Sequence, residues 1–199
     1  MQQNQPLAKV ESRFKAKVNR PELFTTAEVI TGFEHKPVAV ILDAAPAIIQ
    51  TDYHWGLVPH WSSELSFAKH TLNARIETLH EKPSYKDVVT NRCLIIASAF
   101  YEWRWEDEKG KKKTQFTIYS QDDELFAMAG LYTTALIANQ PYHSFTMVTT
   151  QATDIMTYIH NTKNRMPIVL QKGAEAAWLD ASIPVSEFKD NYQAKLVGF

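Results

Sequence analysis

Four polar side chains interrupt segments that are otherwise apolar or aromatic. Glu102 follows the run CLIIASAFY, Asn73 and Arg75 lie within LNARIET, and His160 ends the segment TDIMTYIH. A charge in an apolar setting is costly unless it is paired or hydrogen-bonded, so these residues call for an explanation. Partial desolvation raises the pKa of a carboxyl group, which suits Glu102 to acid–base chemistry near neutral pH.

Each of these residues also has a purely structural interpretation. Glu102 shares a strand face with Arg104 and can form an ion pair with it. His160 can complement the dipole at the C-terminus of a helix. Asn73 can cap or turn the backbone. From the residues alone, both interpretations stay open.

Three further side chains have core and functional alternatives. Trp55 and Trp61 flank GLVPH and can either fill the core or offer ring faces to nucleobases. Cys93 stands inside an apolar strand, and we interpret it as a core residue.

Several common enzyme classes lack their signatures. The six glycines form no phosphate-binding or dinucleotide-binding loop, and no serine lies in a nucleophile elbow. The seven histidines lack metal-ligand spacing, and Cys93 has no second thiol. We therefore expect neither a metal site nor an organic cofactor.

The composition predicts a soluble globular protein with one domain over residues 1–199. Hydrophobic residues make up 45% and charged residues 22%, as is usual for such proteins. The net charge of −1 means that nucleic-acid binding would need a local patch. The cluster KGKKK at 109–113 is interpreted as a solvated hairpin tip.

The expected location is the cytoplasm. One cysteine excludes an internal disulfide and favours a reducing compartment. The sequence begins without the apolar core of a signal peptide and contains no apolar run of membrane length. We expect a monomer that does not bind a membrane.

The elements that must position the polar residues are mainly strands. Helices are predicted for LAKVESRFKAKV, around 83–89, for TDIMTYIH with Thr153 or Asp154 as its cap, and for GAEAAWLD. Two strands are predicted on either side of a turn at 44–46. One strand is predicted over RCLIIASAFYEWRW, and TQFTIYS is its partner in a hairpin. Three further strands are predicted in ELFAMAGLYTTAL, YHSFTMVTTQA and MPIVL. The pattern predicts an α+β fold whose antiparallel sheet curls into a barrel-like core with peripheral helices.

Five motifs occur in a fixed order: WGLVPHW, LNARIET, RCLIIASAFYEW, AMAGLY and IHNTKNRMPIVL. In this order they resemble the SRAP family (SOS-response-associated peptidase domain), over about residues 50–170. The resemblance implies a β-rich single domain that crosslinks itself to abasic sites in single-stranded DNA. It also implies a role in the DNA-damage response, association with the nucleoid on damaged DNA, and a peptidase-like processing of its own N-terminus.

The resemblance implies a mechanism and a set of residues. In the family, an N-terminal cysteine condenses with the sugar aldehyde through its α-amine and closes a thiazolidine ring through its thiol. By resemblance the catalytic residues are Asn73, which hydrogen-bonds the sugar or N-terminus, Glu102, which moves protons, and His160, which protonates the sugar oxygen. The residues expected to contact DNA are Arg75, Trp55, Trp61, Thr149 and Arg165.

This sequence departs from the family pattern at position 2, where Gln2 stands in place of the cysteine. Three interpretations are open: a short native Met-Cys segment precedes these residues, a divergent protein forms only a Schiff base or binds damaged DNA, or the activity is lost. Because Asn73, Glu102 and His160 are all present, we expect the first. A milder departure is the insertion NTKN between His160 and Arg165. The functional alternative is a module that binds single-stranded or gapped DNA without catalysis.

Overall fold

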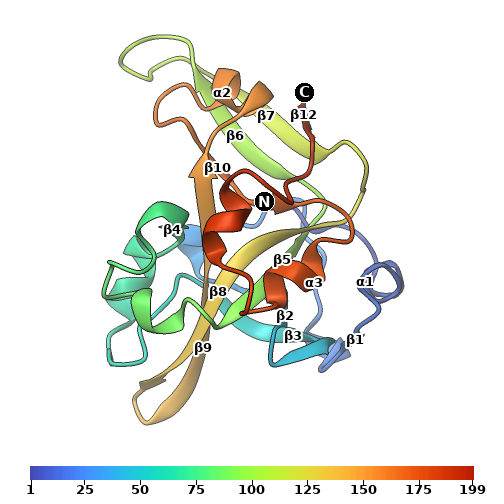
Figure 1. Cartoon of the computed structure of the whole chain (residues 1–199), viewed down its shortest axis with the longest axis vertical. Coiled ribbons are helices and arrows are strands. Elements are labelled where there is room, and N and C mark those ends of the chain that lie inside the picture. Colours follow the sequence, from blue (N-terminus) through green and yellow to red (C-terminus); the bar gives the residue numbers. More distant parts are fainter.

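Five strands close into a barrel in the computed structural model, which describes residues 1–199. In barrel order they are β3 (Ala45–Trp55), β2 (Pro37–Leu42), β5 (Arg92–Ala97), β8 (Phe126–Ile137) and β9 (Gln140–Gln151). Neighbours pair antiparallel except β9 and β3, which close the barrel in parallel where His54 pairs with Ser144 and Trp55 with Phe145. The predicted α+β class with a mainly antiparallel barrel-like core is confirmed (Figure 1).

Short elements extend the barrel or cover it. The remaining strands of the large sheet are β1 (Lys17–Val18), β4 (Asn73–Arg75), β10 (Arg165–Pro167) and β11 (Val169–Leu170). The α-helices are α1 (Leu7–Phe14), α2 (Asp154–Ile159) and α3 (Glu175–Leu179). Short 3-10 helices cover Pro21–Leu23, Gly32–Glu34, Leu65–His70, Ile76–Thr78, Lys86–Val88 and Val185–Lys189. None of the helices combines the length and hydrophobicity that crossing a lipid bilayer requires.

Side chains along the barrel strands alternate between two apolar clusters, as the pleat of a strand requires. The inner cluster takes residues from all five barrel strands, among them Val40, Tyr53, Ile95, Met128 and Phe145. The outer cluster packs beneath α1 and α3 and includes Leu94, Ala129, Val10 and Trp178. Cys93 is fully buried in the inner cluster, so its interpretation as a core residue is confirmed.

The expected single strand over residues 92–105 is wrong, because the chain changes sheet in the middle of it. β5 ends at Ala97, and β6 (Phe100–Trp105) belongs to a separate sheet with β7 (Lys113–Ser120) and β12 (Leu196–Gly198). The N-terminal segment pairs at this break: Gln2 N donates to Ala99 O at 2.7 Å, and Ser98 N donates to Gln2 O at 2.9 Å. The amino terminus is thereby brought to the start of β6.

The predicted hairpin is confirmed as the antiparallel pair β6–β7, in which Glu102 lies opposite Phe116. Its turn contains Gly110, whose positive φ of 61° favours glycine. The lysines at its tip are exposed, as expected. The helix α2 packs against β6 and β12 at this end of the molecule (Figure 1).

Three smaller predictions are corrected in part. The helix expected around 83–89 is one 3-10 turn at Lys86–Val88. Thr153 does precede α2, but its hydroxyl makes no capping bond and instead lies 3.9 Å from Met166 Sδ. The strand expected in MPIVL is two short strands, β10 and β11, which pair with β9 and β8 respectively.

Candidate active site at the amino terminus

The α-amine of Met1 is held inside the protein. Met1 is 7% exposed and belongs to the inner apolar cluster. Its amine donates to Ile30 O at 2.9 Å, while Ile30 N donates to Met1 O at 2.8 Å. Two backbone hydrogen bonds between Gln3 and Ala27 also hold the N-terminal segment in place. These contacts leave the amine little freedom to move.

Burial makes this amine a nucleophile at neutral pH. Desolvation lowers the pKa of the Met1 amine from 8.0 to about 6, although the negative charge of Glu102 acts in the opposite direction. Roughly nine in ten such amines are then neutral at pH 7. A neutral amine carries the lone pair that attacks an aldehyde carbon.

The Glu102 side chain is half-buried on β6. Burial raises the pKa of its carboxyl group, and the charges of His160 and of the Met1 ammonium partly oppose this shift. Glu102 therefore lies within electrostatic range of both His160 and the N-terminal amine.

The ion pair between Glu102 and Arg104, one of the two interpretations left open by the sequence, does not form. Arg104 instead donates to Tyr158 O and lies 3.6 Å from a carboxylate oxygen of Glu106. Glu102 has no salt-bridge partner and remains available for acid–base chemistry.

His160 ends α2 and is oriented through its backbone neighbours. Its Nδ1 lies 2.5 Å from Arg165 O, so the neutral ring donates from Nδ1 to that carbonyl and keeps its lone pair on Nε2, while the protonated ring also carries a proton on Nε2. The inserted NTKN makes this bond possible, because Asn164 takes a positive φ of 49° and returns the chain, with Asn164 N donating to His160 O at 3.0 Å. The insertion forms a tight turn that returns Arg165 to His160.

The side chain of Arg165, the residue that follows this turn, forms several hydrogen bonds within the protein. Its guanidinium donates to both carboxylate oxygens of Glu77, at 2.8 and 3.0 Å, and to Thr149 O at 2.7 Å and Thr149 Oγ1 at 3.2 Å. The side chain is 13% exposed. Arg165 and Thr149, both expected to contact DNA, are therefore engaged within the protein.

Glu77→Ala is predicted to lower the free energy of unfolding by about 1–3 kcal/mol, because it leaves a largely buried guanidinium without its carboxylate. This loss is smaller than for a fully buried pair, since the Glu77 side chain is 36% exposed. Urea denaturation measures the change. The control is Glu34→Ala, which removes an exposed pair with Lys36 and should cost less than about 0.5 kcal/mol. Equal losses in the two variants would contradict the prediction.

Asn73 and Arg75 begin and end β4, which pairs parallel with β9. The Asn73 side chain is exposed and makes no hydrogen bond, although its carbonyl accepts from Tyr85 Oη at 3.2 Å. Its neighbour Leu72 packs against the same apolar cluster as Met1. Arg75 is exposed and has no salt-bridge partner, so its charge faces solvent.

The two tryptophans of WGLVPHW have different environments. Trp55 is 9% exposed, stacks on Phe145 with ring centroids 6.3 Å apart, and donates from Nε1 to Leu72 O at 2.9 Å. Trp61 is 51% exposed and meets the ring of Phe67 edge-on at 5.2 Å. Only Trp61 presents a ring to solvent, whereas Trp55 has the core role that the sequence left as an alternative.

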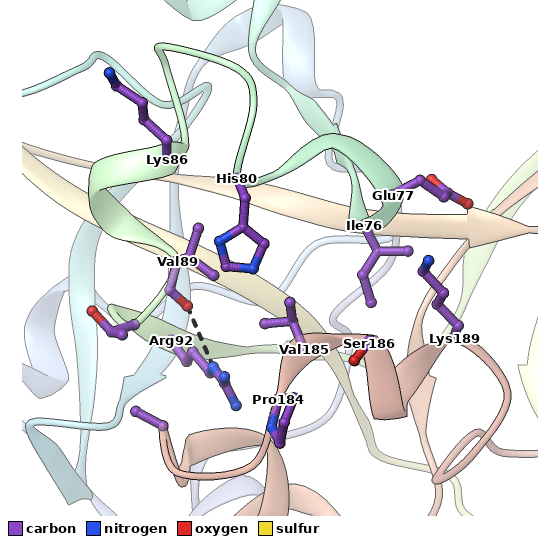
Figure 2. A pocket seen from close by; sticks show the side chains of 12 residues that line it. Ile76, Glu77, His80, Lys86, Val89, Arg92, Pro184, Val185, Ser186 and Lys189 are labelled. Atoms are coloured by element: carbon purple, nitrogen blue, oxygen red, sulfur yellow. Dashed lines mark hydrogen bonds between the residues drawn. The ribbon is translucent and has the colours of Figure 1, made fainter.

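A surface cavity of about 470 Å³ lies beside the Glu77–Arg165 pair but does not contain the site. It is lined by residues that include His80, Arg92, Val185 and Lys189, and by neither Met1, Glu102 nor His160 (Figure 2). The buried Arg92 guanidinium is committed to the carbonyl oxygens of Trp178, Asp180 and Ile183, at 2.8–3.2 Å. This commitment leaves Arg92 few donors for a ligand.

Sequence reasoning did not identify two parts of this arrangement. The burial of the Met1 amine has no local signal, because it depends on contacts with Ile30, which is 29 residues away. Glu77 lies within LNARIET, but nothing in the sequence indicates that it pairs with Arg165, 88 residues away. The sequence feature that marks Glu77 as a candidate is its position in a motif that also contains Asn73 and Arg75.

Comparison with known proteins places the chain in a family. The family model described as SOS response associated peptidase (SRAP) matches residues 2–196. The chain is 39% identical over 128 residues to the abasic site processing protein YoqW of Bacillus subtilis. The aligned region covers 63% of this chain and 55% of that protein. The chain is 32% identical over 164 residues to the abasic site processing protein HMCES of Gallus gallus, covering 68% and 47% respectively. The chain thus spans about half the length of these curated relatives.

A solved structure extends the likeness to the whole fold. The crystal structure of a protein from Bacteroides thetaiotaomicron superposes with a TM-score of 0.86 at 26% identity, covering 99% of this chain and 90% of that one. The five ordered motifs, the barrel and the family model agree. The chain belongs to the SOS response associated peptidase (SRAP) family.

Proposed function

We propose that this protein processes abasic sites in single-stranded DNA by joining an N-terminal α-amine to the sugar aldehyde. The observation that carries the proposal is the Met1 amine, which burial keeps largely neutral and which lies within electrostatic range of Glu102. The names of its relatives, abasic site processing proteins, agree with this substrate.

The proposed reaction balances without any cofactor. The amine lone pair adds to the aldehyde carbon, and a proton moves from nitrogen to oxygen through Glu102 to give a carbinolamine. The carboxyl group of Glu102 then protonates the hydroxyl, which leaves as water while the nitrogen lone pair forms the C=N bond. Loss of the last proton to the carboxylate gives an imine and restores Glu102. His160, with its lone pair on Nε2, is proposed to exchange a proton with the sugar ring oxygen as the ring opens.

Asn73, Arg75 and Trp61 are proposed to hold the strand. The exposed amide of Asn73 has no protein partner and is free to hydrogen-bond the sugar. The unpaired charge of Arg75 suits a phosphate, and the exposed ring of Trp61 suits a base. We propose support roles for Thr149 and Arg165, because their polar atoms already bond within the protein.

The lifetime of the adduct depends on whether a thiol lies beside the amine that forms it. Cys93 is fully buried in β5, and burial raises the pKa of its thiol well above the ordinary value, which makes it a poor nucleophile. The adduct of a Met1 amine therefore stops at the imine, which water reverses and which a hydride donor reduces to a stable amine. A cysteine in the position of Met1 would add its thiol to the C=N carbon and close a thiazolidine.

The test is a denaturing gel with single-stranded DNA that contains one abasic site. The unmodified chain is expected to give a crosslinked band only with borohydride, whereas a chain with cysteine in the place of Met1 is expected to give the band without reductant. An undamaged strand is the control. If neither protein gives a band with borohydride, the covalent function is wrong. Binding that then disappears at high salt would favour the non-covalent alternative.

Peptidase-like self-processing is a second candidate for the same site. Any peptide bond formed by the Met1 nitrogen would lie beside Glu102 and His160, because that nitrogen is fixed by its bond to Ile30 O. Intact mass measurement of a chain with a short N-terminal extension tests this candidate. An extension that stays uncleaved over hours would contradict it.

A further inference from the structure

An aromatic residue and a cation lie together on the rim of the candidate site. Tyr158 is on α2, two residues before His160, and is 58% exposed. Arg104 is on β6, two residues after Glu102, so the two side chains leave the strand on the same face. The packing of α2 against β6 brings Tyr158 and Arg104 into contact (Figure 1).

One face of the Tyr158 ring is already covered. The guanidinium carbon of Arg104 lies 3.9 Å from the ring centroid, and Arg104 Nη1 donates to Tyr158 O. Phe116 meets the ring edge-on, with centroids 6.4 Å apart and planes at 86°. Because Tyr158 is nevertheless 58% exposed, its free area lies on the face opposite Arg104 and along the outer edge.

The backbone that follows Tyr158 is also tied to β6. Asn161 Nδ2 donates to Trp105 O at 2.9 Å, and Asn161 Oδ1 accepts from Trp105 N at 3.0 Å. This pair of bonds ties the turn after α2 to the end of β6. A rigid ring loses little conformational entropy when a ligand stacks on it, which favours binding.

We propose that the free face of Tyr158 stacks a nucleobase adjacent to the abasic sugar. This inference rests on the proposed function, since it takes the lesion to lie at Met1, Glu102 and His160. A base next to an abasic site has lost a stacking neighbour, and an aromatic ring backed by a cation replaces it without regard to base identity. The ligand class is therefore any nucleobase of a single strand, and the contact gives affinity for the lesion's flank without sequence preference.

The experiment uses strands with a tetrahydrofuran abasic analogue, which has no aldehyde and forms no imine. A fluorescent 2-aminopurine is placed on either the 5′ or the 3′ side of the analogue. Binding of the unmodified protein is expected to quench one of the two probes by stacking. Tyr158→Ala is expected to abolish this quenching and to weaken binding about 5- to 140-fold, whereas Tyr158→Phe keeps both.

The matched control is Tyr119→Ala on β7, a 38% exposed tyrosine whose ring lies 6.4 Å from that of Phe199. It should change neither quenching nor affinity. If the unmodified protein quenches neither probe, or if Tyr158→Ala behaves like Tyr119→Ala, the inference is wrong. Crosslinking of the natural abasic strand is measured separately. If crosslinking is absent while quenching still depends on Tyr158, the covalent function is wrong and the stacking contact is retained.

Discussion

A Gly-Ser-Gly extension before Met1 is expected to abolish crosslinking to abasic DNA, even with borohydride present. The extension converts the Met1 α-amine into an amide, whose lone pair is delocalised into the carbonyl group and does not attack an aldehyde. The amide N–H can still donate to Ile30 O, so the fold should tolerate the change. A borohydride-trapped band on a denaturing gel is the measurement.

The control for this extension is the same tripeptide after Phe199, whose side chain is 81% exposed. That protein should crosslink like the unmodified chain. Intact mass measurement must show that the N-terminal extension is retained, because self-processing would regenerate the amine. A full-strength band from protein with the extension intact would show that an amine other than that of Met1, either a lysine or the new glycine α-amine, is the nucleophile.

Glu102→Gln is expected to slow crosslinking by about 10²- to 10⁴-fold, the range that general acid–base catalysis contributes. The amide neither gives nor accepts a proton at neutral pH, while its size keeps the packing of β6. The same change also alters the pH dependence. The negative charge of Glu102 raises the pKa of the Met1 amine, which burial lowers to about 6, so removing that charge lowers this pKa further.

The rate of the unmodified protein is expected to rise with pH through about 6, as the ammonium gives up its proton. In Glu102→Gln this rise should move to lower pH while the plateau falls. Single-turnover rates between pH 4.5 and 8 measure both effects. Glu106→Gln is the control, since Glu106 lies beyond the site and its side chain is 42% exposed. If the plateau rate falls but the pH at which the rate rises stays the same, Glu102 supports the fold and does not act on the amine.

The fold shows which part of the family's chemistry is affected by Gln2, which stands where the family has a cysteine. Desolvation lowers the pKa of the Met1 amine to about 6, which favours imine formation, whereas a methionine side chain has no thiol that could close a ring. Amine and thiol thus contribute separately, the first to formation of the adduct and the second to its lifetime. Comparing the unmodified chain with the cysteine-substituted chain separates the two contributions.

Local patterns in the sequence determined most of the elements and the family. Alternation along ELFAMAGLYTTAL and YHSFTMVTTQA specifies β8 and β9, and the charged turn around Gly110 specifies the β6–β7 hairpin, because period and turn chemistry act between neighbouring residues. The five ordered motifs indicated the family that the family model then matched. The sequence also indicates Glu102 and His160, as polar residues in apolar segments.

Only the tertiary structure decided which groups meet. At the break between β5 and β6, Gln2 pairs with Ala99, a contact between residues 97 positions apart that no local pattern encodes. The same break brings the Met1 amine near Glu102, and burial there lowers its pKa to about 6. The partners of Arg165 and Tyr158 were likewise set by long-range packing. Sequence determines what each side chain can do, whereas burial and proximity, which are properties of the folded chain, determine which of them act together.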